Sequence, residues 1–237
     1  MSTFRSDPKA ALAAYREQGF HLEPEMLSVE ECEALINAGA CLPPTREGVV
    51  APVMHPHRYG PIFLQALRKP EIVHVLELLV GGRVSGLQTQ YFFCPPGTPG
   101  FSMHQDNFYA GAAPEVFASA WTALEDVTPE NGGLILWPGT HREPVLPVRE
   151  VANRPLSASQ DPNANWRETV MPPGYAPLSV SVPRGAVVFL HGQLVHSSHD
   201  NASQKRWRRA LLMTYIRTGE HFRPGLSSGR AEVELYP

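Results

Sequence analysis

Prolines and glycines divide this chain into short segments, and this spacing constrains its fold more than any other feature. The 237 residues include 24 prolines and 19 glycines, and the proline share is about twice the average. Beyond residue 82, apolar runs rich in Val, Phe, Leu and Tyr alternate with Pro/Gly turns. The runs are 83–94, 115–125, 133–137, 178–182, 186–191 and 209–217. This pattern predicts a mainly β sandwich or barrel of antiparallel strands rather than alternating β-α units.

Helices are expected before that β-rich part. Asp7-Pro8 and Gly19 mark the start and the end of a helix over 9–18. A capping box of Ser28 and Glu31 starts a second helix that ends near Gly39, and Gly81-Gly82 ends a third helix over 71–80. We therefore expect one domain over 1–237, with helices over about 7–80 and a β core over about 83–217. Chains of this length commonly fold as one β domain.

The triplet His104-Gln105-Asp106 is the first candidate for a chemical site. On a β-strand, residues two apart point to the same face, so His104 and Asp106 would lie side by side while Gln105 turns away. A distant histidine would complete the two-His, one-carboxylate set of non-haem Fe(II) oxygenases. Such triplets also arise by chance, since the chain has 10 histidines and 23 acidic residues. In that alternative interpretation, the triplet belongs to an ordinary strand whose polar face is exposed to solvent.

The residues around the triplet favour a metal site over a chance occurrence. Apolar and aromatic side chains flank it, namely Phe101, Met103, Phe108 and Tyr109, and the turn 97–100 precedes it. Far along the chain, 187–196 is typical of a strand, a turn and the start of another strand, ending at His196. The arginines that follow at 206–209 could bind a dianionic co-substrate.

Several segments follow one another in a distinctive order. They are QTQYFF at 88–93, HQDNFY at 104–109, AWTALEDV at 120–127, ENGGL at 130–134, PGTHR at 138–142, and HSSHDNAS at 196–203 followed by RRA at 208–210. From about residue 15 to 217 the chain resembles the phytanoyl-CoA dioxygenase (PhyH) family. The resemblance implies a double-stranded β-helix, a jelly-roll or cupin-like barrel with flanking N-terminal helices.

The resemblance also implies the site residues. It makes His104, Asp106 and His196 both the metal ligands and the catalytic centre. His191 and His199 flank the distal ligand and remain alternatives to it. His191 ends an apolar strand and is expected to be structural or to orient a ligand, whereas His199 falls in a polar turn.

For the co-substrate, the resemblance makes Arg208 the anchor of the distal carboxylate of 2-oxoglutarate. The other residues that it places near the co-substrate and metal are Ser198, Gln90 and Trp121. The interval between Ser203 and the paired arginines is one residue longer than the family usually has, so Arg206 and Arg209 remain competitors. Alternation on a strand would put Arg206 and Arg208 on one face.

The implied activity is that of an Fe(II)- and 2-oxoglutarate-dependent oxygenase. With O2 it would hydroxylate, desaturate or cyclise an unactivated C–H position of a small organic molecule and release succinate and CO2. Related halogenases replace the carboxylate ligand by a small residue, whereas Asp106 is present here. Two alternatives stay open: a cupin-like metalloenzyme without 2-oxoglutarate, and a non-catalytic jelly-roll binding protein. The first would not need an arginine after His196.

Charge and composition argue against nucleic-acid-binding, membrane-binding, secreted and disulfide-rich proteins. The net charge of −3 and the pI near 6.4 provide no basic surface for nucleic acid or an anionic membrane. The amino terminus lacks the apolar centre of a signal peptide, so we expect a cytoplasmic enzyme. Cys32, Cys41 and Cys94 are odd in number and lack C-x-x-C spacing, which argues against disulfides and a cysteine zinc site. The sequence does not predict the oligomeric state.

Two poorly patterned segments are candidates for substrate recognition. They are 55–59, and the proline-rich insert 144–175. Ligand-contacting groups concentrate on loops carried by a rigid scaffold, so we expect substrate specificity there rather than on the strands. Both segments could instead be surface connections.

Overall fold

A computed structural model describes residues 2–42, 52–151, 167–225 and 229–236. Its strands are β1 (Phe20–Glu23), β2 (Val53–Met54), β3 (Val84–Cys94), β4 (Phe117–Ala123), β5 (Leu134–Leu136), β6 (Val148–Glu150), β7 (Arg167–Thr169), β8 (Leu178–Ser179), β9 (Val187–His191), β10 (His196–Ser198) and β11 (Arg208–Arg217). The α-helices are α1 (Pro8–Gln18), α2 (Val29–Gly39), α3 (Pro61–Leu67), α4 (Pro70–Val80) and α5 (Asp106–Ala110), and short 3-10 helices span Pro56–Arg58, Pro114–Val116 and Thr140–Arg142.

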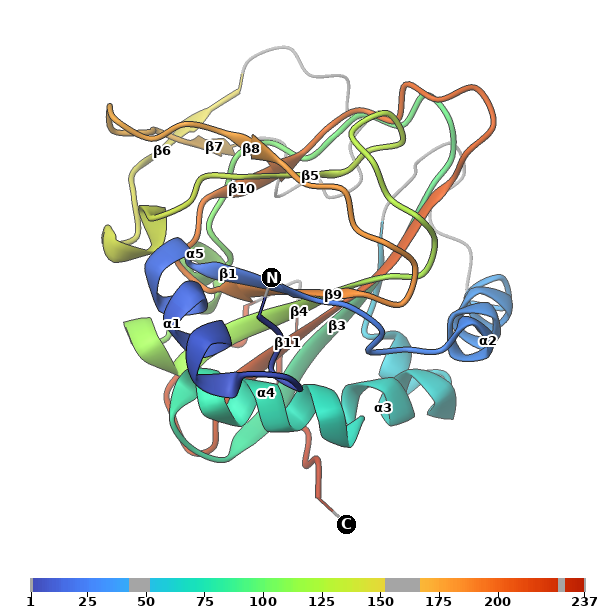
Figure 1. Cartoon of the computed structure of the whole chain (residues 1–237), viewed down its shortest axis with the longest axis horizontal. Helices are drawn as coiled ribbons and strands as arrows, with labels where there is room; N and C mark the ends of the chain where they lie inside the picture. Colours follow the sequence, from blue (N-terminus) through green and yellow to red (C-terminus); the bar gives the residue numbers. More distant parts are fainter. Residues whose placement is uncertain (1, 43–51, 152–166, 226–228, 237) are drawn as a thin grey trace.

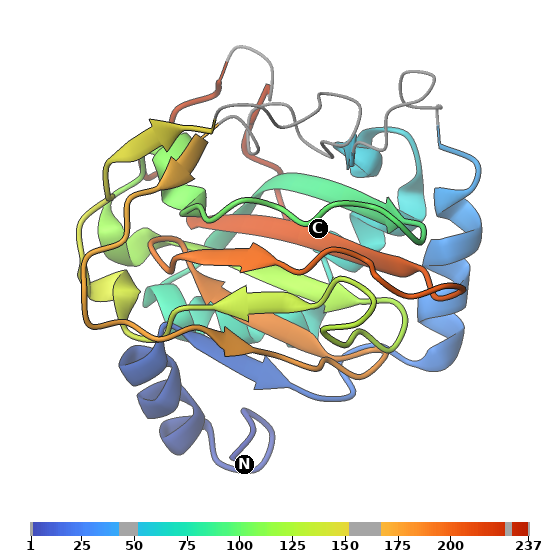
Figure 2. The ribbon, with the colours of Figure 1, turned by 90° about the horizontal axis from the view of Figure 1, so that it is seen from above.

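Two antiparallel sheets face each other and form the barrel. The larger sheet has the order β1-β9-β4-β11-β3-β2, and the smaller has the order β10-β5-β8. Figure 1 shows the larger sheet between the helices α1, α3 and α4 and the smaller sheet, and Figure 2 shows the smaller sheet lying over the larger one. The predicted mainly β jelly roll with flanking N-terminal helices is confirmed.

The predicted helices form where their end signals lie. The Asp7 side chain accepts a hydrogen bond from a main-chain N–H of α1 at 3.0 Å, and Gly19 ends this helix in the left-handed region. Ser28 and Glu31 exchange both hydrogen bonds of the capping box, at 3.2 and 2.7 Å. Gly81 ends α4 with φ of 69°. The sequence reasoning missed α3, whose seven residues span about two turns and give a weak periodic signal.

The larger sheet has an apolar core on each face. Toward the helices, Leu76 of α4 packs in one cluster with Phe189 and Tyr215. Toward the smaller sheet, Trp121 and Leu190 are buried in a second cluster. Fully burying a large apolar side chain contributes about 1.5–3 kcal/mol relative to its exposure. The two cores hold the larger sheet rigidly between the helices and the smaller sheet, so this sheet is a firm base for a site inside the barrel.

Two short strands form within the insert between β5 and β8. The expectation of an unpatterned insert over 144–175 is wrong at its two ends, because β6 and β7 pair from Val148 opposite Thr169 to Glu150 opposite Arg167. Each strand has only three residues, too few for a periodic signal. Residues 152–166, the centre of the insert, lie outside the described residues.

The segment after β11 returns across the helix side of the larger sheet. Val233 and Gly86 exchange main-chain hydrogen bonds at 2.7 and 2.9 Å, and Tyr236 donates to Glu77 of α4 at 2.5 Å. Within the described ranges, none of the helices is long and apolar enough to cross a lipid bilayer.

Candidate metal centre

The structure brings His104, Asp106 and His196 together inside one end of the barrel. One potential ligand atom from each lies within 4.8 Å of the others. Oδ1 of Asp106 is 3.7 Å from Nε2 of His104 and 3.8 Å from Nε2 of His196. These distances exceed a hydrogen bond, so the imidazoles face the carboxylate without donating to it. Among the described residues this is the one cluster with metal-binding spacing.

Main-chain carbonyls orient both imidazoles. Nδ1 of His104 lies 2.8 Å from the carbonyl oxygen of Ser102, and Nδ1 of His196 lies 3.0 Å from that of Leu194. A protonated Nδ1 that donates to a carbonyl leaves Nε2 with its lone pair, as a metal ligand requires. The two Nε2 atoms and one carboxylate oxygen therefore form a donor set that fits a divalent cation.

The protonation state of His104 also fits a ligand. Burial and, to a smaller extent, the neighbouring His196 together lower its pKa from 6.5 to about 4, while Asp106 opposes this shift. The imidazole is thus neutral at pH 7. A cation would not have to displace a proton from this ring near neutral pH.

One prediction about the triplet is wrong. His104 makes an isolated bridge to His196, but Asp106 is the first residue of α5 rather than part of a strand. A carboxylate is favoured in the first turn of a helix, and five helical residues are too few for a sequence signal. The prediction for Gln105 is confirmed: it turns away, donates to the Gln193 carbonyl at 2.7 Å and accepts from a main-chain N–H at 2.7 Å.

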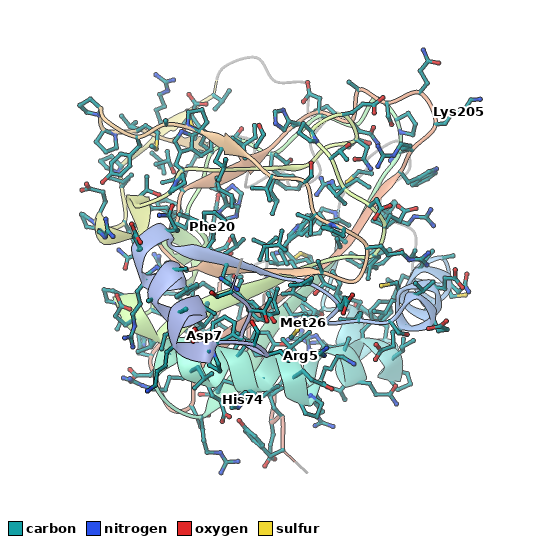
Figure 3. The ribbon with its side chains drawn as sticks, in the orientation of Figure 1. Arg5, Asp7, Phe20, Met26, His74 and Lys205 are labelled. Atoms are coloured by element: carbon teal, nitrogen blue, oxygen red, sulfur yellow. The ribbon has the colours of Figure 1, made fainter. Side chains whose placement is uncertain are left out.

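The three arginines near β11 have different surroundings. Arg208 is 2% exposed, and its guanidinium carbon lies 5.4 Å from the ring centre of Phe92 in the barrel core. Arg209 pairs with Glu125, with contacts of 2.6 and 3.0 Å. Lys205, in the same basic run, is exposed and lies at the outer end of the β10–β11 connection (Figure 3).

Arg206 lies before the strand. It donates to the carbonyl of Asp126 at 2.7 Å and to Thr128 at 3.2 Å. Since β11 begins at Arg208, the expectation that alternation aligns Arg206 with Arg208 on a strand is wrong. The loop 199–207 turns back on itself through Asn201, which donates to the Arg206 carbonyl at 2.8 Å.

The remaining predicted site residues line the space between the sheets. Ser198 lies on β10 and accepts a hydrogen bond from the Phe101 N–H at 2.9 Å. Gln90 on β3 and Trp121 on β4 both lie opposite Leu212 of β11. Residues opposite each other in adjacent strands share a face. Leu212 and Trp121 belong to the core between the sheets, so Gln90 shares that face.

The two alternative histidines lie apart from the centre. His191 is buried, and the centre of its ring lies 5.1 Å from the ring centre of His141. Its Nε2 lies 3.6 Å from Oε1 of Glu115. His199 is hydrogen-bonded through Nε2 to Ser179 of β8 at 2.8 Å. Neither belongs to the metal-binding cluster among the described residues.

The segment 55–59 contains both buried and exposed side chains. His55 and His57 are buried, and Nδ1 of His57 lies 2.7 Å from Oγ1 of Thr89. Tyr59 is 64% exposed. The role of the segment 55–59 in substrate specificity stays a prediction.

The sequence reasoning missed Ser119. Its hydroxyl donates to Oδ2 of Asp106 at 2.7 Å, and the residue is fully buried in β4. The available signal was its position two residues before Trp121, which puts both side chains on one face of a strand. Nothing in the sequence indicates which distant carboxylate this serine meets.

Known proteins resemble this chain in sequence and in fold. Residues 15–210 match phytanoyl-CoA dioxygenase (PhyH). The chain belongs to this family. It is 30% identical to phytanoyl-CoA dioxygenase 1 of Oryza sativa subsp. japonica over 75% of the chain and 61% of that protein. It is 27% identical to the human peroxisomal phytanoyl-CoA dioxygenase over 65% of the chain and 45% of that protein. This PhyH chain thus spans less than two thirds of the length of these relatives.

Solved structures share the fold over nearly their whole length. The non-haem α-ketoglutarate-dependent carbocyclase SnoK from nogalamycin biosynthesis is 26% identical, with a TM-score of 0.76 over 100% of this chain and 98% of SnoK. The epimerase SnoN from the same biosynthesis is 21% identical, with a TM-score of 0.74 over 93% of this chain and 89% of SnoN. The double-stranded β-helix predicted for this PhyH protein is therefore confirmed.

Proposed function

We propose that this PhyH protein is an Fe(II)- and 2-oxoglutarate-dependent oxygenase that oxidises an unactivated C–H bond of a small organic molecule. The observation that carries the proposal is the joint presence of two imidazoles, one carboxylate and a buried arginine in one barrel. Two histidines and one carboxylate on one face of a metal are the donor set of non-haem Fe(II) oxygenases. Family membership supports the same activity.

In this proposal, Nε2 of His104, Nε2 of His196 and Oδ1 of Asp106 hold the metal. When bound, Fe(II) would supply the activation of O2 that couples decarboxylation of 2-oxoglutarate, to succinate and CO2, to oxidation of the substrate. The protein orients the ligands before the metal arrives, since both imidazoles are held by main-chain carbonyls. Asp106 favours a hydroxylase, desaturase or cyclase over a halogenase, which lacks this carboxylate.

Arg208 binds the distal carboxylate of 2-oxoglutarate in this proposal. A guanidinium in a desolvated barrel makes charge-assisted, bidentate hydrogen bonds to a carboxylate. Ser198 would lie beside the same group, with Gln90 and Trp121 on the facing sheet. Arg209 is a weaker candidate because Glu125 already neutralises it, and Arg206 because its guanidinium binds the 126–128 loop.

The proposed substrate is a free small molecule rather than a coenzyme A thioester. The support is the similarity to SnoK, a carbocyclase of nogalamycin biosynthesis, which is 26% identical with a TM-score of 0.76 over 100% of this chain. This supports a substrate from specialised metabolism. Aromatic side chains near His104, including Phe101 and Tyr109, would exclude water during the reaction.

The proposal extends to organisation and location. The helices over 7–80 and the β core over 83–217 would act as one catalytic domain, since α4 packs against β3, β4 and β11. The cytoplasmic location predicted from the sequence remains part of the proposal.

An anaerobic titration with Fe(II) and 2-oxoglutarate tests the function. We expect a weak visible charge-transfer band from the chelated α-keto acid, and its loss in the Asp106→Ala variant. If the band is missing while calorimetry still detects metal binding, the enzyme is a cupin-like metalloenzyme without this co-substrate. If neither metal nor 2-oxoglutarate binds, the barrel is a non-catalytic binding protein. Either result overturns the proposal.

A further inference from the structure

The carboxylate of Asp106 has two oxygens in different surroundings. Oδ1 faces both imidazoles at 3.7 and 3.8 Å, whereas Oδ2 accepts a hydrogen bond from the Ser119 hydroxyl at 2.7 Å. We propose that Ser119 is a positioning residue that restrains Asp106 so that it binds the metal through Oδ1 alone. This inference rests on the proposed function, because it assigns a task within the same centre.

Ser119 is well placed to fix another side chain. It is fully buried in β4, the third strand of a six-stranded sheet, and pairs with Leu190 of β9 on one side and Thr214 of β11 on the other. With its backbone held on both edges, only rotation about its side-chain bonds can move the hydroxyl. Most buried hydroxyls have a hydrogen-bond partner, and Asp106 is the partner that the structure gives to Ser119.

Asp106 itself has fewer local restraints. It is the first residue of the five-residue α5, and short helices are marginal without tertiary contacts. An ionised carboxylate only accepts hydrogen bonds, so the Ser119 hydroxyl must be the donor. Charge-assisted bonds of this kind are about twice as strong as neutral ones. The rigid strand therefore sets the rotation of the carboxylate.

The restraint has a consequence for co-substrate binding. A carboxylate that bound the metal through both oxygens would take an additional coordination position, and the proposed activity needs the open positions for 2-oxoglutarate. Engaging Oδ2 with Ser119 opposes this second mode. Groups that orient metal ligands typically contribute 10–100-fold to metal affinity. Ser119 would thus act on metal affinity and on the number of protein donor atoms at the metal.

The test compares Ser119→Ala with Thr122→Val, a matched control on the same strand. Thr122 is also fully buried, and within the described part of the chain its hydroxyl has no hydrogen-bond partner. Thr122→Val therefore removes a buried hydroxyl that does not touch Asp106. Each protein, as the full chain without metal, is first checked for folding by circular dichroism. Co(II) is then titrated by calorimetry and by visible absorption, which is sensitive to coordination number.

We expect Ser119→Ala to bind Co(II) about 10–100-fold more weakly than the unsubstituted protein, with an altered Co(II) spectrum, and Thr122→Val to match the unsubstituted protein in both measurements. Equal affinity and a superimposable spectrum for Ser119→Ala would overturn the inference, as would an equal loss in Thr122→Val. Failure of the proposed function is a separate result, in which the unsubstituted protein binds Co(II) but no 2-oxoglutarate, or no metal at all.

Discussion

His104 and His196 are joined by two main-chain hydrogen bonds, with each N–H donating to the other's carbonyl at 2.9 and 3.0 Å. The two residues come from distant parts of the sequence, yet this bridge fixes their separation independently of any ion. Their rings lie 4.2 Å apart between centroids. The centre is therefore assembled by the fold, and metal binding would not have to organise it.

This arrangement predicts that single ligand substitutions remove metal binding without unfolding the protein. His104→Ala and His196→Ala keep the main-chain bridge, so far-ultraviolet circular dichroism should remain that of the unsubstituted protein. Fe(II) affinity, measured anaerobically by calorimetry, should fall by more than the roughly 10–100-fold that follows loss of a group orienting a ligand.

His199→Ala is the control for these substitutions. His199 is bonded to Ser179 outside the metal cluster, so its removal should change Fe(II) affinity by less than about twofold, which is below 1 kcal/mol. If His191→Ala abolished metal binding while His196→Ala retained it, the assignment of the distal ligand would be wrong.

The sequence predicts the parts of this protein that depend on local signals. The capping box of Ser28 and Glu31 and the long apolar runs of β3 and β11 gave helices and strands close to those observed. The helical position of Asp106 could not be predicted, because α5 has five residues and depends on tertiary contacts. The contact of Ser119 with Asp106 is likewise set by how β4 packs near α5, which no local pattern reveals.

A second prediction concerns the anchor of 2-oxoglutarate. Losing the charged partner of a carboxylate in a desolvated site costs about 2–5 kcal/mol, so Arg208→Ala should raise the dissociation constant for 2-oxoglutarate at least roughly thirtyfold. Metal affinity should change much less. The measurement is calorimetry on the anaerobic Fe(II)-loaded protein.

Arg209→Ala and Arg206→Ala are the matched controls for the anchor. Arg209 pairs with Glu125 on the barrel exterior, and Arg206 binds the 126–128 loop. Both guanidinium groups remain in contact with solvent, with side chains 27% exposed for Arg209 and 39% for Arg206. Solvent-screened interactions of this kind contribute about 0–1 kcal/mol, so 2-oxoglutarate binding should change at most about fivefold. A thirtyfold loss at Arg206 with none at Arg208 would move the anchor to Arg206.

Buried histidines predict how stability depends on pH. Burial lowers the pKa values of His57 and His191 to about 4, whereas an unfolded histidine titrates near 6.5. Between these values the unfolded chain binds protons that the native protein does not, so stability falls as pH decreases from 6.5 toward 4. The slope is about 1.4 kcal/mol per pH unit for each such histidine.

Urea unfolding at several pH values between 7.5 and 4.5 measures this effect. The midpoint should be nearly constant above pH 7 and fall below pH 6.5. His191→Gln removes one of the titrating groups, so its midpoint should fall less steeply over the same range. A midpoint that rises on acidification would contradict the neutral state of these buried rings.

The last prediction concerns Gly100, where two segments of the centre approach closely. A Cβ at this position would lie 2.0 Å from the Ser198 carbonyl oxygen and 2.8 Å from that of His199. These are main-chain atoms of β10 and its loop, so they cannot rotate away as a flexible side chain would. Gly100→Ala should push the segment leading to His104 away from β10 and weaken the bond between the Phe101 N–H and Ser198. Overpacking of this kind typically costs about 1–3 kcal/mol.

Gly82→Ala provides the comparison for Gly100→Ala. Its Cβ would meet only the side chain of Arg217, at 3.1 Å, and this flexible chain can move. Urea unfolding should give a loss of about 1–3 kcal/mol for Gly100→Ala and a change within about 0.5 kcal/mol for Gly82→Ala. Calorimetry should also find weaker 2-oxoglutarate binding for Gly100→Ala alone, because only that substitution displaces Ser198. Unchanged co-substrate binding despite the stability loss would separate Ser198 from the 2-oxoglutarate site.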